Sequence, residues 1–339
     1  MTTRFAINGL GRIGRALLRI VREREGLELV AVNDIGTAEQ LARLLAHDTL
    51  HGRFPEPVAA EGDYLRIGES LVRVFNEADP SAVPWEKTSA TVVVDATGLC
   101  KNRELAEAHR RGPIRKVVVS ANAEGMDLTV CMGVNQDAYD PAAHHLLSAA
   151  SCTTNCLVPV AWLLDCEYGI EAGLLNTVHS YNNDQSLLEA PHRDPRRARA
   201  AALNMIPTTT SAVEAAARIL PRLAGRLQGL AIRVPTPNVS LIDFAVTLDK
   251  RPSVDDLEAL FRAAETGELS GILATTDEEL VSSDFLRQPH SAIVDLPLLQ
   301  RAGDRLYRVI AWYDNEWGHA ARLADLLELA GGEDAGARI

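Results

Sequence analysis

The stretch Gly9-Leu10-Gly11-Arg12-Ile13-Gly14 decides the fold of the first half of the chain. It follows an apolar run at residues 4–7 that predicts a strand, and it opens a segment at 13–24 with helical periodicity. Glycines in such a turn let backbone N–H groups approach a pyrophosphate, and the amino end of the helix adds a favourable field. Asp34 ends the next predicted strand, where its carboxylate would hydrogen-bond an adenine ribose and repel a 2′-phosphate. The motif therefore predicts a dinucleotide-binding unit, against the alternative of a glycine-rich turn with a capping aspartate.

Apolar runs and helical segments alternate through the rest of the first half, which predicts an α/β fold with an N-terminal Rossmann domain built on a doubly wound parallel sheet. The predicted strands are 27–32, 91–95 and 116–120, with a helix at 40–46 and a hairpin at 64–75. After residue 150 the strands lengthen, at 175–179, 230–234, 240–248 and 305–313, with helices at 211–223 and 254–265. This second pattern predicts an α+β domain with a large mixed or antiparallel sheet. We place the first domain at 1–151, completed by a C-terminal helix at 318–331, and the second at 152–317.

Composition narrows the class of protein. The chain has 339 residues, enough for two domains, and its 47% hydrophobic and 24% charged residues are ordinary for a soluble globular protein. A net charge of −12 argues against a nucleic-acid or membrane partner, despite the basic run at 192–199. No apolar run reaches the length of a membrane span, and the N-terminus runs directly into a strand, so we expect no signal peptide. Five cysteines without a CxxC pair predict reduced thiols in the cytoplasm and no metal site.

One cysteine stands at the start of a predicted helix. Ser151-Cys152-Thr153-Thr154-Asn155-Cys156 precedes an apolar stretch at 157–164, and a thiol near a helix N-terminus is expected to have a lowered pKa. Pro159 lies inside that stretch, so the helix is either kinked or starts later. His179 ends a predicted strand and is a candidate base. Spacing alone does not show that the two side chains meet, and by itself it favours a buried structural cysteine and a structural histidine.

The string Ala150-Ser151-Cys152-Thr153-Thr154-Asn155-Cys156 resembles the active-site segment of the glyceraldehyde-3-phosphate dehydrogenases. The resemblance covers nearly the whole chain and continues in order through 8–15, 33–34, 48–54, 133–135, 179–185, 196–201, 206–210, 233–240 and 312–318. It implies an NAD-dependent aldehyde dehydrogenase that oxidises D-glyceraldehyde 3-phosphate to 1,3-bisphosphoglycerate with inorganic phosphate, and it implies a homotetramer.

The resemblance also implies roles for individual residues. Cys152 is the nucleophile that forms a thiohemiacetal and then an acyl thioester, and His179 is its base. The residues implied for the two phosphate groups are Ser151, Thr153, Asn182, Arg197, Thr210, Ser211 and Arg233. Those implied for the cofactor are Gly9, Gly11, Arg12, Ile13, Asp34, Thr97, Ser120 and Asn315, with Asn315 orienting the carboxamide.

Several positions depart from the family pattern and leave the substrate open. Asn182 stands where threonine is usual, Ser211 where glycine is usual, and Glu214 where lysine is common. The alternatives are a non-phosphorylating D-erythrose-4-phosphate dehydrogenase, giving 4-phosphoerythronate, and a catalytically idle homologue that binds or regulates. Ala190 replaces a typical leucine, so NADP is a possible secondary cofactor beside NAD.

Overall fold

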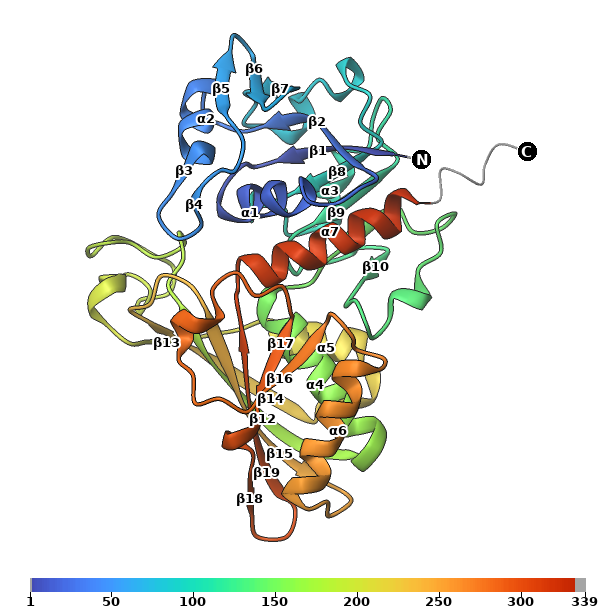
Figure 1. Ribbon diagram of the computed structural model, residues 1–339, viewed down its shortest axis with the longest axis vertical. Coiled ribbons are helices and arrows are strands. Elements are labelled where there is room, and N and C mark those ends of the chain that lie inside the picture. The colour runs from blue at the N-terminus through green and yellow to red at the C-terminus, as the bar shows by residue number, and fades with distance from the viewer. Residues whose placement is uncertain (1, 333–339) are drawn as a thin grey trace. The chain divides into compact units, whose positions relative to one another are not determined.

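The computed structural model describes residues 2–332, and the chain forms two compact units, each with its own sheet (Figure 1). Unit 1 comprises the residues up to Val130, Asp137–Ala150 and the stretch from Ala320. Unit 2 comprises Cys131–Gln136 and Ser151–His319. No helix among residues 2–332 is long and apolar enough to cross a membrane.

Unit 1 is built on a nine-stranded sheet in the order β10-β11-β9-β8-β1-β2-β7-β6-β5. The chain starts in the middle, at β1, and then builds outward in both directions, which is the doubly wound arrangement. The parallel strands are β1 (Thr3–Asn8), β2 (Leu27–Asn33), β7 (Ser70–Phe75), β8 (Val92–Asp95), β9 (Lys116–Val119), β10 (Leu128–Thr129) and β11 (Leu146–Ser148). Antiparallel β5 (Val58–Glu61) and β6 (Tyr64–Ile67) close one edge. Strand β6 also pairs antiparallel with β7, so the hairpin predicted at 64–75 and the parallel sheet are both confirmed.

The helices of unit 1 are α1 (Arg12–Val21), α2 (Ala38–Ala46), α3 (Arg103–Glu107) and most of α7 (Trp317–Gly331). The glycine turn brings α1 close to β1: Gly9 has φ of +92°, and a Cβ on Gly14 would lie 2.3 Å from the carbonyl oxygen of Gly9. Helix α7 is held beside the end of α1 by Arg24, whose Nη1 donates to Asp325 at 2.7 Å (Figure 1). The predicted C-terminal helix therefore packs within unit 1.

Unit 2 is built on an eight-stranded mixed sheet, as predicted, in the order β13-β14-β12-β15-β19-β17-β16 with β18 also paired to β19. Parallel β12 and β14 lie beside antiparallel β15 and β19 at its centre. The strands are β12 (Ile170–Ser180), β13 (Ile206–Thr208), β14 (Leu227–Val234), β15 (Ser240–Leu248), β16 (Leu273–Thr276), β17 (Ala292–Asp295), β18 (Gln300–Ala302) and β19 (Leu306–Tyr313).

Helices α4 (Cys152–Tyr168), α5 (Ala212–Ile219) and α6 (Val254–Thr266) pack on one face of this sheet (Figure 1). The helix predicted at 211–223 is interrupted: α5 ends at Ile219, and a 3₁₀ turn, Pro221–Leu223, follows. Pro221 causes the break because proline lacks an N–H and clashes with the preceding turn. Pro159 lies inside α4, which nonetheless begins at Cys152 and not later.

Candidate active site

The nucleophile candidate is the first residue of a long helix. Ser151 caps α4 with its hydroxyl, which accepts from the N–H of Thr154 at 3.1 Å. Ala150, just before the cap, has φ of +57°, a left-handed conformation that alanine rarely adopts. The turn into α4 is thereby set so that Cys152 lies at the amino end of the helix and remains partly exposed.

The structure brings Cys152 and His179 together, although 27 positions separate them. The thiol sulfur lies 3.5 Å from Nε2 of His179, the next-to-last residue of β12. Nδ1 of the imidazole lies 2.7 Å from the carbonyl oxygen of Ser180. A carbonyl only accepts, so this contact needs the proton on Nδ1, whereas the Arg233 guanidinium, which only donates, contacts the same Nδ1 and needs the other tautomer. Acceptance of the thiol proton by Nε2 requires the tautomer with the proton on Nδ1.

Arg233 is the neighbour of this pair on the next strand. It is paired in register with His179 across the parallel strands β12 and β14. Its Nη1 contacts His179 Nδ1 and donates to the Ser180 carbonyl at 3.2 Å. The Ser180 carbonyl therefore holds both the imidazole and the guanidinium.

Burial controls the protonation of the pair. Loss of hydration, together with the charge of Arg233, lowers the pKa of His179 to about 3. Burial raises the pKa of the Cys152 thiol, although Arg233 and the N–H of Thr153 act in the opposite direction. The lowered thiol pKa expected from the helix N-terminus is therefore wrong, because burial disfavours the thiolate. Burial thus favours the neutral thiol and the neutral imidazole, from which one proton can pass from sulfur to Nε2.

A buried tyrosine, Tyr313, packs against His179 and hydrogen-bonds with Thr153, the residue after Cys152. The Tyr313 hydroxyl lies 2.9 Å from Thr153 Oγ1 and 2.8 Å from Thr177 Oγ1. Its ring meets the His179 ring edge-on, with centroids 6.0 Å apart. Burial raises the pKa of Tyr313, so it stays protonated. Sequence reasoning missed this residue, because a tyrosine within an apolar strand predicts only packing.

Two of the residues predicted for phosphate groups are arginines of unit 2, Arg197 and Arg233. Arg197 donates to Thr208 Oγ1 at 2.8 Å, to Asp184 at 2.7 Å and to the Thr209 carbonyl at 3.2 Å. Burial lowers the pKa of Arg233, and the charge of Arg197 acts in the same direction.

Three more residues predicted for phosphate groups, Thr210, Ser211 and Asn182, lie in loops of unit 2. Thr210 accepts from the N–H of Ala212 at 3.2 Å, and Ser211 precedes the first residue of α5. Asn182 Oδ1 accepts from the N–H of Asp184 at 3.3 Å, which orders the turn after β12. The N-terminus of α5 adds a partial positive charge, and the carboxylate of Glu214 in the first turn offsets part of it.

Except for Asn315, the residues predicted for the cofactor lie at the carboxyl ends of the parallel strands of unit 1, where dinucleotides bind in such sheets. Gly9 and Gly11 follow β1, with Arg12 and Ile13 opening α1; Asp34 follows β2; Thr97 follows β8; and Ser120 follows β9.

The local geometry fits a dinucleotide. A Cβ on Gly11 would meet nothing within 4 Å, which leaves space at the amino end of α1. Asp34 accepts from the N–H groups of Leu10 at 2.7 Å and Gly36 at 2.9 Å, so its carboxylate is fixed beside the turn. The side chains of Ile35 and Leu99 are 81% and 76% exposed at the same strand ends, so they offer apolar surface on which an aromatic base can pack.

A buried polar network ties these strand ends together, and sequence reasoning missed it. Asp95 Oδ1 accepts from the Thr97 hydroxyl at 2.7 Å, and its Oδ2 accepts from Asn8 at 2.7 Å. His109 Nε2 lies 3.2 Å from the same Oδ2, and Asn33 donates to Asn8 at 2.7 Å. The strands β1, β2 and β8 are therefore joined at the edge where the cofactor residues lie.

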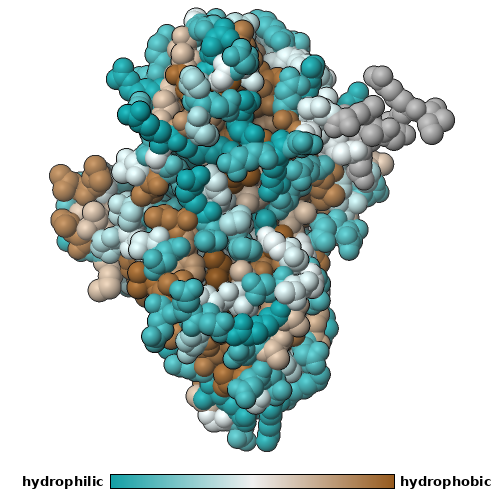
Figure 2. All heavy atoms as spheres, in the orientation of Figure 1, coloured by the Kyte–Doolittle hydropathy of each residue, from teal (hydrophilic) through white to brown (hydrophobic). Residues whose placement is uncertain are grey.

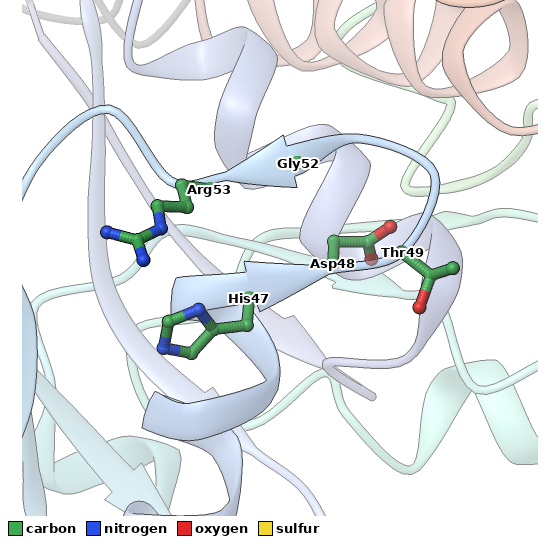
Figure 3. A pocket seen from close by; sticks show the side chains of 5 residues that line it. All are labelled: His47, Asp48, Thr49, Gly52 and Arg53. Carbon is green, nitrogen blue, oxygen red and sulfur yellow. The ribbon is translucent and has the colours of Figure 1, made fainter.

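A small pocket lies at the hairpin of β3 (His47–Asp48) and β4 (Gly52–Arg53), also in unit 1 (Figure 3). It has a volume of about 270 Å³ and is lined by His47, Asp48, Thr49, Gly52 and Arg53. Arg12 donates to Asp48 at 2.6 Å, so the hairpin anchors the arginine of the glycine turn. Within residues 2–332, no group of three or more His, Cys, Asp or Glu side chains could hold a metal ion.

Asn315 follows β19 and lies close to the end of β12. Its Oδ1 accepts from the hydroxyls of Ser180 at 3.0 Å and Ser240 at 2.9 Å. Asp314 fixes the backbone around it by accepting from the N–H groups of Glu316 and Trp317, at 2.9 and 2.8 Å. The chain carries this amide to the same end of the sheet as His179.

Comparison with known proteins agrees with these features. Residues 3–103 match the model described as glyceraldehyde 3-phosphate dehydrogenase, NAD binding domain, and residues 151–315 match the C-terminal domain of the same family. The chain is 45% identical to glyceraldehyde-3-phosphate dehydrogenase 2 of Streptomyces arenae over 98% of this chain and 99% of that protein. It is 45% identical to the Geobacillus stearothermophilus enzyme, over 96% and 97%, and 47% identical to that of Kitasatospora aureofaciens, over 96% and 98%. The chain therefore belongs to the glyceraldehyde-3-phosphate dehydrogenase family of NAD-binding oxidoreductases.

Proposed function

We propose that this protein catalyses the NAD-dependent, phosphorylating oxidation of D-glyceraldehyde 3-phosphate to 1,3-bisphosphoglycerate. The observation that carries the proposal is the thiol of Cys152 at 3.5 Å from Nε2 of His179, with Nδ1 held by the Ser180 carbonyl. The relatives bear the name of this activity. A nucleophile, its base and an orienting group are the parts that covalent catalysis of acyl transfer needs.

The residues of the chain account for each proton. His179 Nε2 accepts the thiol proton as Cys152 sulfur bonds to the aldehyde carbon, and it returns that proton to the oxygen to give the thiohemiacetal. His179 then takes the hydroxyl proton as the C–H bond breaks with its electron pair. NAD, when bound, supplies the acceptor for that hydride. Inorganic phosphate attacks the resulting thioester and the C–S bond breaks, which releases the acyl phosphate. The departing Cys152 sulfur takes the proton that His179 holds, and the proton of the attacking phosphate passes to solvent, so the thiol and the neutral imidazole are restored.

Two groups of residues hold the two phosphates in this proposal. Arg233 and Asn182 hold the phosphate of the substrate. The attacking phosphate is held by Arg197 with the hydroxyl groups of Ser151, Thr153, Thr210 and Ser211. Support comes from Arg197, whose guanidinium donates to the Thr208 hydroxyl and the Thr209 carbonyl directly before Thr210 and Ser211, because guanidinium groups bind phosphate well.

The cofactor is held by Gly9, Gly11, Arg12, Ile13, Asp34, Thr97, Ser120 and Asn315 in this proposal. Asp34 favours NAD, since its carboxylate lies beside the glycine turn and would repel a 2′-phosphate. NADP is a secondary cofactor, admitted by the small Ala190 side chain.

We propose that residues 1–151 and the helix at 318–331 form the NAD-binding domain, and that residues 152–317 form the catalytic domain.

We also propose a cytoplasmic homotetramer. Apolar side chains gather where the loop at 182–205 lies beside β13 (Figures 1 and 2). Leu187, Leu188, Leu203 and Met205 are 70–81% exposed there, which favours contact with another copy. Sedimentation equilibrium of the wild type and of Leu188→Glu tests this assembly: the substitution should dissociate the tetramer, and a monomeric wild type would contradict it.

The activity is tested by NADH formation with glyceraldehyde 3-phosphate and with erythrose 4-phosphate, each with and without inorganic phosphate. Turnover of the three-carbon aldehyde that requires phosphate supports the proposal. Phosphate-independent turnover of erythrose 4-phosphate would instead assign the non-phosphorylating reaction. Cys152→Ser should abolish NADH formation, while Cys166→Ser, which alters the exposed thiol, should retain it. A Cys152→Ser protein with full turnover would refute the mechanism.

A further inference from the structure

The hydroxyl groups of Ser180 and Ser240 determine the orientation of the Asn315 side-chain amide. Three strand ends converge here: Ser180 ends β12, Ser240 begins β15, and Asn315 follows β19. These strands are consecutive neighbours in the sheet, which explains why residues so far apart in sequence meet. Ser180 and Ser240 are 0% and 2% exposed, so both hydroxyls need partners within the protein.

The hydrogen-bond directions follow from the need of two buried hydroxyl hydrogens for an acceptor. The backbone N–H of Ser180 can only donate, and it donates to Ser240 Oγ at 3.1 Å. Ser240 Oγ accepts there and uses its single hydrogen toward Asn315 at 2.9 Å. Ser180 Oγ donates to the same atom at 3.0 Å. An atom that receives two hydroxyl hydrogens is an acceptor, so it is Oδ1. A flipped amide would leave both buried hydroxyl hydrogens without an acceptor.

The opposite end of the amide is then defined as well. Nδ2 of Asn315 makes no hydrogen bond with any of residues 2–332 in the structure. Its two hydrogens are available to a carbonyl oxygen of a bound molecule. Asp314 holds the backbone of this segment through the N–H groups of Glu316, Trp317 and Arg287, so the amide cannot easily turn away.

We infer that Ser180 and Ser240 are positioning residues that lock the Asn315 amide with Nδ2 available as donor to the carboxamide carbonyl of the nicotinamide. The inference rests on the proposed function, which supplies the ligand. A nicotinamide held through its carboxamide presents one ring face to the hydride, whereas one without that hold can rotate about its glycosidic bond. The serine pair therefore controls the facial selectivity of hydride transfer as well as cofactor affinity.

Ser180 acts in two separate ways through two different atoms. Its hydroxyl holds Asn315, and its main-chain carbonyl holds His179 Nδ1 at 2.7 Å. Ser180→Ala removes only the first of these contacts. We expect Ser180→Ala to leave the pH profile of Cys152 alkylation by iodoacetamide unchanged, while cofactor selectivity falls.

The binding test compares NAD with an analogue in which unsubstituted pyridine replaces nicotinamide, using calorimetric titration of the full chain. The wild type should prefer NAD. The Ser180→Ala, Ser240→Ala double variant should lose about two- to tenfold of that preference, the range that one neutral hydrogen bond contributes. Thr247→Ala is the matched control, because it removes a half-buried hydroxyl from the same strand β15. Full preference in the double variant, or an equal loss in the control, would overturn the inference.

The second test follows deuterium from a C1-deuterated glyceraldehyde 3-phosphate into NADH by NMR. The wild type should label one face at C4, and the double variant should label both; a single labelled face in the double variant would contradict the inference. If the double variant does not fold, Ser180→Cys and Ser240→Cys keep the volume with a weaker donor and should shift both readouts in the same direction. A wild type that fails to form NADH refutes the proposed function alone, since the binding test does not depend on turnover.

Discussion

In a His179→Asn variant, the Cys152 thiol loses the imidazole nitrogen that lies 3.5 Å from its sulfur. Burial raises the pKa of that thiol, and even an ordinary cysteine with a pKa of about 8.5 is only ~3% thiolate at pH 7. The thiol therefore depends on a base to attack. General-base catalysis contributes roughly 10²–10⁴-fold, so we expect kcat to fall by about that factor at pH 7, or ~3–5 kcal/mol of transition-state stabilisation.

The loss should depend on pH in a defined direction. Burial and the charge of Arg233 lower the pKa of His179 to about 3, so the wild-type base is neutral and available throughout the range from about pH 5 to 9. In the variant, the thiolate forms only by ionisation, and the rate should rise about tenfold per pH unit until the pH passes the pKa of Cys152. The difference between the two proteins should be smallest at the alkaline end.

Two measurements follow this reaction. Rapid mixing with glyceraldehyde 3-phosphate gives the burst of NADH, and iodoacetamide labelling with mass spectrometry gives the reactivity of Cys152 itself. A Cys166→Ser background removes the exposed thiol from the second assay. His47→Asn, on the exposed hairpin of unit 1, is the matched histidine control and should behave as wild type. A His179→Asn burst within about twofold of wild type at pH 7 would refute the role of this base.

Three further predictions concern other parts of the molecule. Asp34→Ala should raise the NADP-to-NAD ratio of kcat/KM by about tenfold, through ~1.4 kcal/mol of lost repulsion, and an unchanged ratio in steady-state assays would contradict it. Burial opposes ionisation of Asp127, but the Arg103 side chain and two backbone N–H groups lower its pKa to about 2. Because this native pKa lies below the unfolded one, Asp127→Asn should lose ~1–2 kcal/mol at pH 7 in urea unfolding, and the difference should vanish as pH falls from about 4 to 2; a pH-independent difference would count against it. Tyr313→Phe should lower the free energy of unfolding by ~1–3 kcal/mol in the same assay, because the hydroxyls of Thr153 and Thr177 lose a buried partner. A variant of wild-type stability would contradict the importance of these two contacts.

Contiguous sequence patterns predicted most elements of the fold. The strand expected at 240–248 is β15 to the residue, and the helix expected at 254–265 is α6 with one more residue. Both carry a regular period of apolar side chains, which local sequence encodes directly. The helix predicted at 211–223 ends early for a local reason as well. The apolar periodicity continues across Pro221, but proline does not allow the helical hydrogen bonding to continue.

The candidate site was less accessible to such reasoning. Cys152 could be placed at a helix start because its neighbours contain a serine cap and an apolar helix. Its contact with His179 could be inferred only from the family resemblance. Tyr313, Ser180 and Ser240 carry no pattern of their own, because a hydroxyl in a strand can face solvent, core or ligand. The direction of the thiol pKa was predicted wrongly, since it depends on how many protein atoms replace water around the sulfur.

The sequence by itself determined the glycine turn, the carboxylate of Asp34 after the second strand, and the cysteine at the amino end of a helix. Each depends on residues that are neighbours in the chain. Only the tertiary structure decided that Arg233 stands beside His179, that two serines contact the Asn315 amide, and that burial opposes the charged forms of Cys152 and His179. Strand register and burial decide these features, and both sum contributions from residues far apart in sequence, which no local pattern records.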